Sequence, residues 1–266
     1  MKNYIDQFKL NKKKVLIIGG LGLIGFEISR ACLSAGADIY IIDNNKSKIN
    51  QAKKILVNFK KKYKIINLDT SNYKTIGKNY KTVINQVNKI DIFINASYPK
   101  DNYWKKNSFN DITLNSFCNN ISMHMISYAW LPKLIADHMV RNKIQGSIIL
   151  LSSIYGLKGQ DLSIYKNTNI KENMTYSLIK GGINNFVRQM SSYYGKHNIR
   201  VNALCPGGVK DKSQNIAFIK NYSNKVPLKR LAKPSEIASC ALFLSSEASS
   251  YITGTTLIVD GGWTAI

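Results

Sequence analysis

Seven short apolar runs recur along the chain, and longer segments separate them. The runs occupy residues 15–18, 39–42, 65–68, 90–94, 147–151, 199–204 and 256–259. Several intervening segments, among them 26–35 and 237–244, place apolar residues at the spacing of a helix face. Strands that alternate with helices indicate βαβ units and a parallel sheet. Because the runs are continuously apolar, we expect a sheet that is covered on both faces.

The chain of 266 residues is expected to form one domain. This length is ordinary for a single α/β unit, and a hydrophobic content of 44% supplies a substantial core. No internal repeat or change of composition marks a boundary. Residues 1–13 are polar and basic, so we expect a loose arm there. Residues 157–174 and 208–230 lack a periodic pattern, which predicts substrate loops over a site.

Several classes of protein are disfavoured. No long apolar run is present, so no membrane span is expected, and the first residues lack the apolar stretch of a secretory signal. We therefore expect a cytoplasmic protein. The four cysteines have no partner at ligand spacing, which predicts neither a disulfide framework nor a metal site. They are Cys32, Cys118, Cys205 and Cys240.

The formal net charge of +23 raises the question of a nucleic-acid partner. The basic residues comprise 33 lysines and 5 arginines, whereas recognition of bases and phosphates favours arginine. The lysines are also spread along the chain rather than gathered in a tail. We therefore expect a solvated, diffusely charged surface and no nucleic-acid partner, although anionic substrates would gain from the field. Retention on duplex DNA at physiological salt would indicate the alternative.

A glycine-rich turn follows the first apolar run and opens a helical pattern. It contains Gly19, Gly22 and Gly25, with Leu23 and Ile24 between the last two. Glycines allow a tight turn and a close approach of the backbone to a pyrophosphate, which the helix N-terminus then faces. The turn therefore favours a dinucleotide site, although such a turn alone is weak evidence.

Two acidic residues at strand ends bear on the dinucleotide. Asp43 lies 18 residues after Gly25, at the end of the second run. A carboxylate there can accept hydrogen bonds from both ribose hydroxyls of NAD and repels the 2′-phosphate of NADP; the alternative is a turn residue. Lys46 and Lys48 follow closely, so NADP is disfavoured but stays open. Asp69, after the third run, either contacts the adenine amino group or caps a turn.

Polar side chains also follow the fourth and fifth runs. Asn95 lies at the edge where ligands bind in open α/β sheets. It either faces the ligand or ties neighbouring strands together through its amide, and the two roles are compatible. Ser152 and Ser153 follow the fifth run. A hydroxyl there either binds a substrate oxygen or caps a turn.

Tyr176 and Lys180 are four residues apart, hence on one face of a helix. An unperturbed phenol, with a pKa of about 10, is a poor base at neutral pH. A fixed cation nearby favours the phenolate, and lowering the pKa to about 7 takes roughly 4 kcal/mol. Lys180, aided by the positive charge of a nicotinamide, could supply that energy. Taken alone, such a pair is more often a surface pair.

Together these residues resemble the short-chain dehydrogenase/reductase family over residues 14–263. The resemblance extends to the Cys-Pro-Gly-Gly-Val segment at 205–209 and to the segment 250–262. It implies a single-domain Rossmann-type α/β fold, with a doubly wound parallel sheet of about seven strands flanked by helices. It also implies a homodimer or homotetramer, formed through the helices at 120–141 and 175–194.

The resemblance implies roles for individual residues. Tyr176 corresponds to the catalytic acid/base, and Lys180 to the residue that binds the nicotinamide ribose and lowers the tyrosine pKa. Ser153 corresponds to the hydroxyl that orients the substrate oxygen, with Ser152 as its neighbour. The residues implied to bind the cofactor are Gly19, Gly22, Leu23, Ile24, Gly25, Asp43, Asp69, Asn95, Ala96, Tyr176, Lys180, Pro206, Gly207 and Val209.

One catalytic assignment is less direct, and the chain departs from the family pattern in places. Asn120 corresponds to the asparagine that supports a proton-relay water, with Asn119 and Asn115 as rivals. Leu23 occupies the place of the usual middle glycine. A long insertion precedes Tyr176.

Part of this pattern resembles one subgroup of the family. Segments 96–103 and 152–156, with the long insertion, resemble bacterial oxidoreductases of surface-glycan and flagellin-glycan synthesis, including nonulosonate-type sugar pathways. That resemblance implies a sugar or sugar-phosphate substrate. Five lysines in the two candidate loops either bind a phosphate or belong to the general lysine excess. They are Lys158, Lys166, Lys171, Lys210 and Lys212.

We therefore predict an NAD-dependent oxidoreductase that interconverts an alcohol and a carbonyl on a small polar substrate. Tyr176 would move the hydroxyl proton and Ser153 would bind the developing oxyanion. One alternative is an NADPH-dependent 3-oxoacyl-thioester reductase, which Asp43 disfavours. The other is a non-catalytic NAD-binding sensor, which the intact set of Ser153, Tyr176 and Lys180 disfavours.

Overall fold

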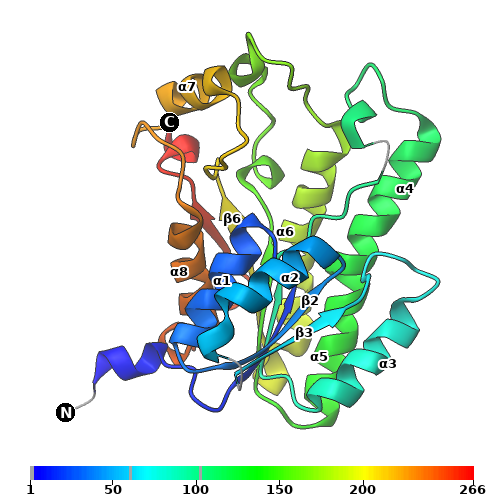
Figure 1. Ribbon diagram of the computed structural model, residues 1–266, viewed down its shortest axis with the longest axis vertical. Helices are drawn as coiled ribbons and strands as arrows, with labels where there is room; N and C mark the ends of the chain where they lie inside the picture. Colours follow the sequence, from blue (N-terminus) through cyan, green and yellow to red (C-terminus); the bar gives the residue numbers. More distant parts are fainter. Residues whose placement is uncertain (1–2, 60–61, 102–103) are drawn as a thin grey trace.

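The seven expected strands all form, and they pair in parallel within one sheet (Figure 1). The computed structural model describes residues 3–59, 62–101 and 104–266. The strands are β1 (Lys14–Ile18), β2 (Asp38–Asp43), β3 (Tyr63–Asn67), β4 (Ile92–Asn95), β5 (Ser147–Leu151), β6 (Arg200–Pro206) and β7 (Thr256–Val259). Their order is β3-β2-β1-β4-β5-β6-β7. The Rossmann-type doubly wound fold is thus confirmed.

The strand order reverses between β1 and β4, which are hydrogen-bonded neighbours. The chain moves outward from β1 to β3 and then returns to the other side of β1. In open α/β sheets, ligands bind at the carboxyl ends of the strands at such a reversal. The topology therefore places the site beside the residues that follow Ile18 and Asn95.

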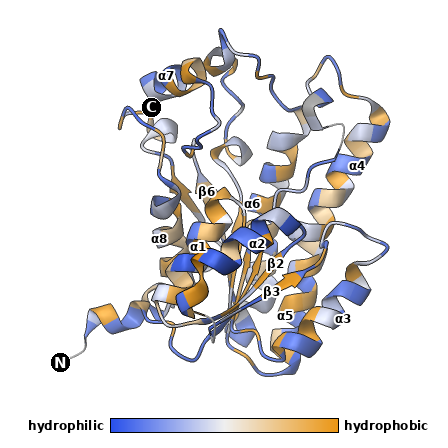
Figure 2. Cartoon of the chain, viewed as in Figure 1, coloured by the Kyte–Doolittle hydropathy of each residue, from blue (hydrophilic) through white to orange (hydrophobic). Residues whose placement is uncertain are grey.

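Helices cover both faces of the sheet, as the continuously apolar strands require. One core joins the sheet to α1, α2 and α8, and a second joins its other face to α3, α5 and α6. Figure 2 shows the apolar residues gathered on the strands. The helices are α1 (Leu23–Ser34), α2 (Lys46–Ile55), α3 (Ile76–Val87), α4 (Leu114–Met125), α5 (Leu131–Arg141), α6 (Met174–Tyr194), α7 (Ile216–Lys225) and α8 (Pro234–Ser245).

Capping residues explain where several helices begin. The side chain of Asn45 accepts a hydrogen bond from the backbone N–H of Lys48 at 3.0 Å, which starts α2 just after Asp43. Thr113 accepts from Ser116 N at 3.2 Å and starts α4. Between α4 and α5 the chain continues as a π-helix, Ile126–Trp130. Such a turn often marks a functional site.

The N-terminal segment differs from the expected loose arm. Tyr4–Phe8 form a short 3₁₀ helix. Leu10 is buried, and its N–H donates to the carbonyl of Ala35 at 2.7 Å. Phe8 also contacts the ring of Phe243. Phe8 and Leu10 thus attach the end of this segment to the fold, whereas Tyr4 and Ile5 stay exposed.

The two segments without a periodic pattern pack against each other. Asn221 Nδ2, on α7, donates to Lys166 O at 2.8 Å, and Lys225 pairs with Asp161 at 2.6 Å. Tyr165 stacks on Phe218. These segments, residues 157–174 and 208–230, are called the cap lobe below. It lies at the upper end of the molecule in Figure 1, where α7 is labelled.

Among the described residues, no helix is both long and apolar enough to cross a membrane.

Candidate active site

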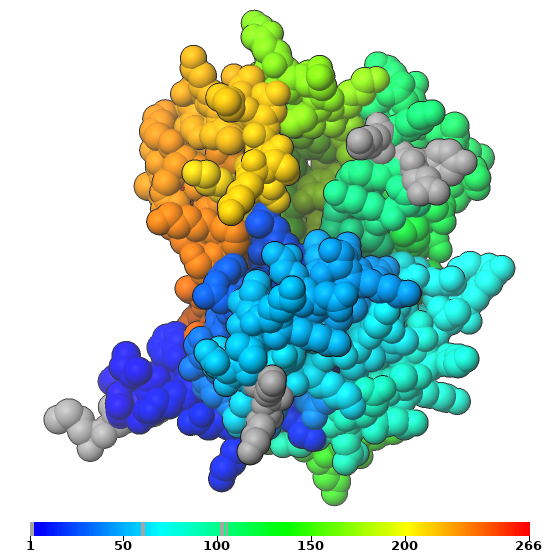
Figure 3. Space-filling model, in the orientation of Figure 1, coloured from blue at the N-terminus to red at the C-terminus, as the bar shows by residue number. Residues whose placement is uncertain are grey.

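A cleft of about 780 Å³ opens at the carboxyl ends of the strands. Figure 3 shows the hollow between the cap lobe above and the N-terminal part of the chain below. Most of the residues predicted to bind a cofactor or to act in catalysis line it: Gly19, Gly22, Leu23, Ile24, Asp43, Asp69, Ala96, Ser153, Tyr176, Lys180, Pro206, Gly207 and Val209. Gly25, Asn95 and Asn120 are absent from that wall. The reversal of strand order therefore does gather residues that are far apart in sequence.

The glycine turn depends on two close approaches. Gly19 has a φ of +67°, and a Cβ there would lie 2.6 Å from the Cα of Ser97. A Cβ on Gly25 would collide with the carbonyl oxygen of Gly19. Gly25 thus lies behind the turn and permits it to fold. Gly22 precedes α1 without a side-chain cap, so the first N–H groups of the helix are open to a ligand.

The carboxylate of Asp43 holds the glycine turn through hydrogen bonds. Its Oδ2 accepts a hydrogen bond from Leu21 N at 3.2 Å, and its Oδ1 accepts from Asn45 N at 3.0 Å. Each carboxylate oxygen has a further lone pair for a ribose hydroxyl. Asp43 is therefore a turn residue, and its carboxylate also lines the cleft with acceptor capacity left for a ligand. Asp69 is exposed and accepts from Ser71 N at 2.8 Å, as a turn cap does, while it also lines the cleft.

Asn95 has a structural role behind the cleft. It is fully buried, and its Nδ2 donates to Ser127 O at 2.8 Å. Its Oδ1 accepts from Ser97 N at 3.0 Å. The amide thus ties the end of β4 to the π-helix, rather than to a neighbouring strand as one interpretation expected.

The two serines after β5 have different partners. The Ser152 hydroxyl donates to the backbone carbonyl of Lys180 at 3.1 Å, which holds α6 against β5. The Ser153 hydroxyl is close enough to Tyr176 to lower the pKa of that phenol. The structure therefore places Ser153, rather than Ser152, against Tyr176.

Lys180 lies fully inside the protein. Its Nζ donates to Leu151 O at 2.8 Å and lies 5.7 Å from the ring centroid of Tyr176. The rings of Tyr98 and Tyr128 also surround it, at 5.7 and 4.9 Å. These π faces and one carbonyl are the environment of a buried cation.

The pKa directions differ from the sequence-based expectation. Burial lowers the pKa of Lys180 to about 7. Burial also raises the pKa of Tyr176, and the contact with Ser153 opposes only part of that effect. Lys180, aided by a bound nicotinamide, was expected to lower the tyrosine pKa; in the chain without that cofactor, burial holds the pKa of Tyr176 above its ordinary value. Burial leaves the lysine only partly charged at neutral pH, so the field that would favour the phenolate is weakened.

The asparagines on α4 are distinguished by burial. Asn120 is fully buried, and its Oδ1 accepts from the Thr175 hydroxyl at 2.6 Å. Asn119 is exposed and donates to Asp101 at 2.7 Å, and Asn115 is exposed. Only Asn120 of the three thus contacts the residue that precedes Tyr176.

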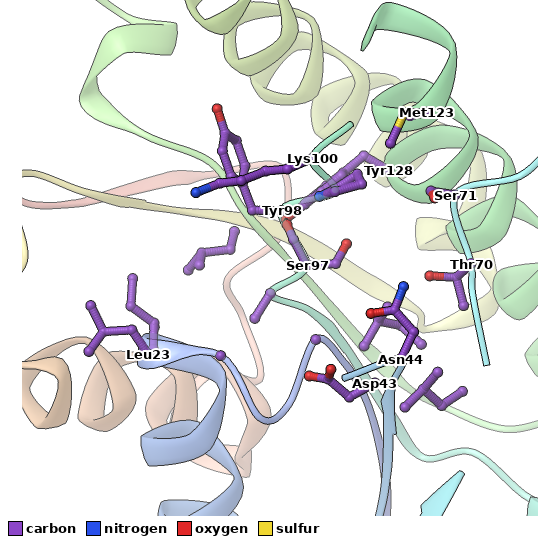
Figure 4. Close-up of a pocket in the computed structure, with 18 of the residues that line it drawn as sticks. Leu23, Asp43, Asn44, Thr70, Ser71, Ser97, Tyr98, Lys100, Met123 and Tyr128 are labelled. Atoms are coloured by element: carbon purple, nitrogen blue, oxygen red, sulfur yellow. The ribbon is translucent and has the colours of Figure 1, made fainter. Parts of the chain in front are cut away.

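The wall opposite the glycine turn contains residues that the sequence did not single out. Figure 4 shows Leu23 and Asp43 on one side of the cleft and Tyr98, Lys100 and Tyr128 on the other. Tyr98 follows β4 by three residues, and its ring lies 5.7 Å from that of Tyr176. Its place just beyond a strand end was a signal that could have found it. Tyr128 lies in the π-helix, which periodicity does not predict.

The five lysines suggested for phosphate binding do not line the cleft. Lys171 pairs with Asp111 at 2.7 Å, and Lys158 lies near the C-terminal carbonyl. The cleft instead contains Lys48, Lys100 and Lys180.

The site fits a dinucleotide. The cradle at Gly19 excludes a side chain, the start of α1 is open, and Asp43 lies at the end of β2. Among the residues that the structure describes, no cluster of three or more His, Cys, Asp or Glu side chains could hold a metal ion.

Known proteins resemble the chain over nearly its whole length. A family model described as enoyl-(acyl carrier protein) reductase matches residues 22–264. Post-translational flagellin modification protein A of Campylobacter coli is 29% identical, over 96% of this chain and 99% of the relative. D-arabinitol 2-dehydrogenase (ribulose-forming) of Candida albicans is 28% identical, over 98% and 96%. 3-Oxoacyl-[acyl-carrier-protein] reductase FabG of Chlamydia pneumoniae is 30% identical, over 95% and 97%.

Solved structures agree with the fold. A short-chain dehydrogenase from Leptospira borgpetersenii with bound NAD⁺ has a TM-score of 0.84 at 30% identity, over 99% of this chain and 96% of that one. A gluconate 5-dehydrogenase from Burkholderia cenocepacia in complex with NADP and tartrate has a TM-score of 0.85 at 22% identity, over 99% and 100%. The chain belongs to the short-chain dehydrogenase/reductase family of oxidoreductases.

Proposed function

We propose that the protein is an NAD-dependent oxidoreductase that interconverts an alcohol and a carbonyl on a sugar or sugar phosphate. The pathway would be the synthesis of bacterial surface polysaccharide. The observation that carries the proposal is the meeting of Ser153, Tyr176 and Lys180 with the Asp43-supported glycine turn in one cleft.

Each catalytic residue has a separate role in the proposed reaction. Ser153 binds the substrate oxygen and Tyr176 transfers its proton, because both groups line the cleft within reach of each other. Lys180 supplies the positive charge that makes the phenolate accessible. A bound nicotinamide supplies hydride exchange and, when oxidised, a second positive charge.

The environment of Tyr176 favours a hydroxyl-rich substrate. Tyr98 and Tyr155 flank it, with ring centroids 5.7 and 6.3 Å away. The cleft is lined by the hydroxyl-bearing side chains of Ser97, Tyr98 and Ser153, which suit a ligand that brings its own hydroxyls. The names of the flagellin-modification and arabinitol relatives agree with that class.

Asp43 supports NAD as the preferred cofactor. Its carboxylate lies at the end of β2, where a 2′-phosphate would meet a negative charge. NAD⁺ is also the nucleotide named in the Leptospira structure. Lys48 in the same cleft is the feature that favours NADP instead.

A second candidate is a 3-oxoacyl-thioester reductase that uses NADPH. The FabG relative and Lys48 favour it. Asp43 and the tyrosines around the site favour the first proposal.

The experiment begins with fluorescence titrations of NADH and NADPH. A screen of reduced-nicotinamide absorbance follows, against sugars, polyols, sugar phosphates, nucleotide sugars and an acetoacetyl thioester. We expect tighter NADH binding and turnover of a sugar-class compound. Preference for NADPH with turnover of the thioester would establish the second candidate.

Tyr176→Phe is the control for catalysis. It should abolish turnover and leave NADH binding intact. A physiological response that survives this substitution would instead indicate the NAD-binding sensor. We also propose a cytoplasmic homodimer or homotetramer that pairs α4–α5 and α6. The exposed Trp130 lies in the π-helix between α4 and α5, and the exposed Leu178 and Tyr193 lie on α6. Size-exclusion chromatography with light scattering tests the assembly.

A further inference from the structure

The buried face of α4 is polar. Its buried residues are Ser116, Asn120 and His124, which are each separated by four positions and so share one stripe of the helix. An amphipathic helix ordinarily buries apolar side chains there. This stripe faces α6, which carries Tyr176 and Lys180. Core packing therefore does not explain why this stripe is polar.

His124 differs from its neighbours in the stripe because it has no partner. Ser116 donates to Asn107 at 2.6 Å, and Asn120 accepts from Thr175 at 2.6 Å. Both ring nitrogens of His124 are buried without a hydrogen bond, and so is the Nδ2 of Asn120. An unpaired buried polar atom costs about 1–3 kcal/mol, so each needs an explanation.

In the described part of the chain, Lys180 has too few hydrogen-bond acceptors, just as His124 lacks hydrogen-bond partners. An ammonium group has three donors, and the structure gives Lys180 Nζ one acceptor among the described residues, Leu151 O. His124 lies within range of the Lys180 charge, which lowers the pKa of the imidazole, and both groups contact the ring of Tyr98. The imidazole centroid is 5.0 Å, and Lys180 Nζ 5.7 Å, from the centroid of that ring.

The protonation state of His124 suits an acceptor. Burial and the charge of Lys180 lower its pKa to about 3, so the ring is neutral throughout the physiological range. The Pro99 backbone lies close enough to oppose part of that shift, although neither ring nitrogen of His124 forms a hydrogen bond with it. A neutral imidazole that donates at one nitrogen has a free lone pair at the other.

We propose that His124 is a positioning residue for Lys180. Its neutral imidazole, with the Asn120 side chain one turn away, holds the lysine ammonium through a shared water molecule. A buried polar site with several partners is where such a water is stable. His124 thereby keeps the cation charged beside Tyr176. The inference rests on the proposed function for its catalytic consequence, but not for its direct test.

The alternative is that His124 is an aromatic packing group against Tyr98. His124→Phe keeps a ring and removes both nitrogens, whereas His124→Gln keeps an acceptor. His138→Phe is the matched control, because His138 is also buried with an orphaned Nε2 but lies on α5. Thermal unfolding establishes that each variant is folded.

The direct test is ¹⁵N NMR of lysine-labelled protein without cofactor or substrate, with Lys180 assigned from Lys180→Met. We expect His124→Phe to lower the titration midpoint of Lys180 by about one pH unit, a tenfold change in its protonation equilibrium. His124→Gln and His138→Phe should keep the wild-type midpoint. An unchanged midpoint in His124→Phe would overturn the proposal, whatever the substrate is.

The catalytic test follows once a substrate is known. His124→Phe should lower kcat by about tenfold at neutral pH, with KM within about twofold, and His124→Gln should restore most of the rate. Equal losses in both variants would support a packing role and overturn the proposal. If the wild-type protein turns over no compound in the screen, the proposed function fails while the NMR result still decides the role of His124.

Discussion

The ammonium of Lys180 donates a hydrogen bond to the backbone carbonyl of Leu151, at 2.8 Å, across the contact between α6 and β5. The Ser152 hydroxyl returns a bond to the carbonyl of Lys180 at 3.1 Å. These two bonds fix the helix that carries Tyr176 to the strand that ends at Ser153. The sheet therefore fixes the relative positions of Lys180 and Ser153.

Lys180→Met should stabilise the fold while it abolishes turnover. A buried ammonium with one backbone acceptor pays a desolvation cost that a thioether of similar length avoids. Because burial depresses the lysine pKa from 10.5 to about 7, the unfolded chain binds more protons between those values. The burial of Lys180 therefore leaves the free energy of unfolding unchanged above about pH 10.5, where the lysine is neutral in both states. It lowers the free energy of unfolding progressively as the pH falls from 10.5 to 7.

The stability difference between Lys180→Met and wild type should consequently be largest near pH 7. It should shrink toward pH 10 by at most about 1.4 kcal/mol per pH unit. Urea unfolding of both proteins at several pH values measures it, and the subtraction cancels groups common to both. A difference that grows with rising pH would contradict the depressed pKa.

Asn95→Ala should destabilise the protein by about 2–4 kcal/mol. The substitution removes the bonds to Ser127 O and Ser97 N and leaves those buried groups unpaired. Asn115→Ala is the control, because Asn115 is exposed, and its cost should stay within about 0.5 kcal/mol. Equal midpoints in urea for the two variants would show that the tie between β4 and the π-helix carries no stability.

The strands and the glycine turn were predictable because each depends on local pattern. Continuous apolar runs specify buried parallel strands, and β1 is buried from Val15 to Ile18. The turn needs Gly19 because its φ is positive and Ser97 approaches closely. Helical spacing put Tyr176 and Lys180 on one face of a helix, whereas their assignment to the catalytic site came from the family resemblance.

The opposite wall of the cleft was not predictable in the same way. Tyr98 reaches Tyr176 only through tertiary packing, and Tyr128 faces Lys180 because a π-helix breaks the regular period. The neutral His124 also depends on burial that its own helix does not reveal. The burial of Leu10 was not predicted either, because the N-terminal segment around it is mostly polar and basic.

Gly19→Ala should weaken both folding and cofactor binding. A side chain at a positive φ costs about 1–3 kcal/mol, and the new Cβ would meet Ser97. We expect the Kd for NADH to rise by at least about tenfold, because the turn must move out of register with α1. Gly77→Ala is the control. Gly77 lies on α3 with no atom near a new Cβ, so this change should stabilise the protein by about 0.5–1 kcal/mol and leave binding intact.

Asp43→Ser should change the choice of cofactor. The substitution removes the negative charge that a 2′-phosphate would meet and weakens the acceptor that holds Leu21 N. We expect the Kd for NADH to rise by about 10- to 100-fold, whereas the Kd for NADPH should stay the same or fall. Fluorescence titration with both nucleotides measures the ratio. Asp69→Ser, at an exposed turn in the same cleft, should alter both affinities alike. Unchanged selectivity in Asp43→Ser would show that the carboxylate acts only as support for the glycine turn.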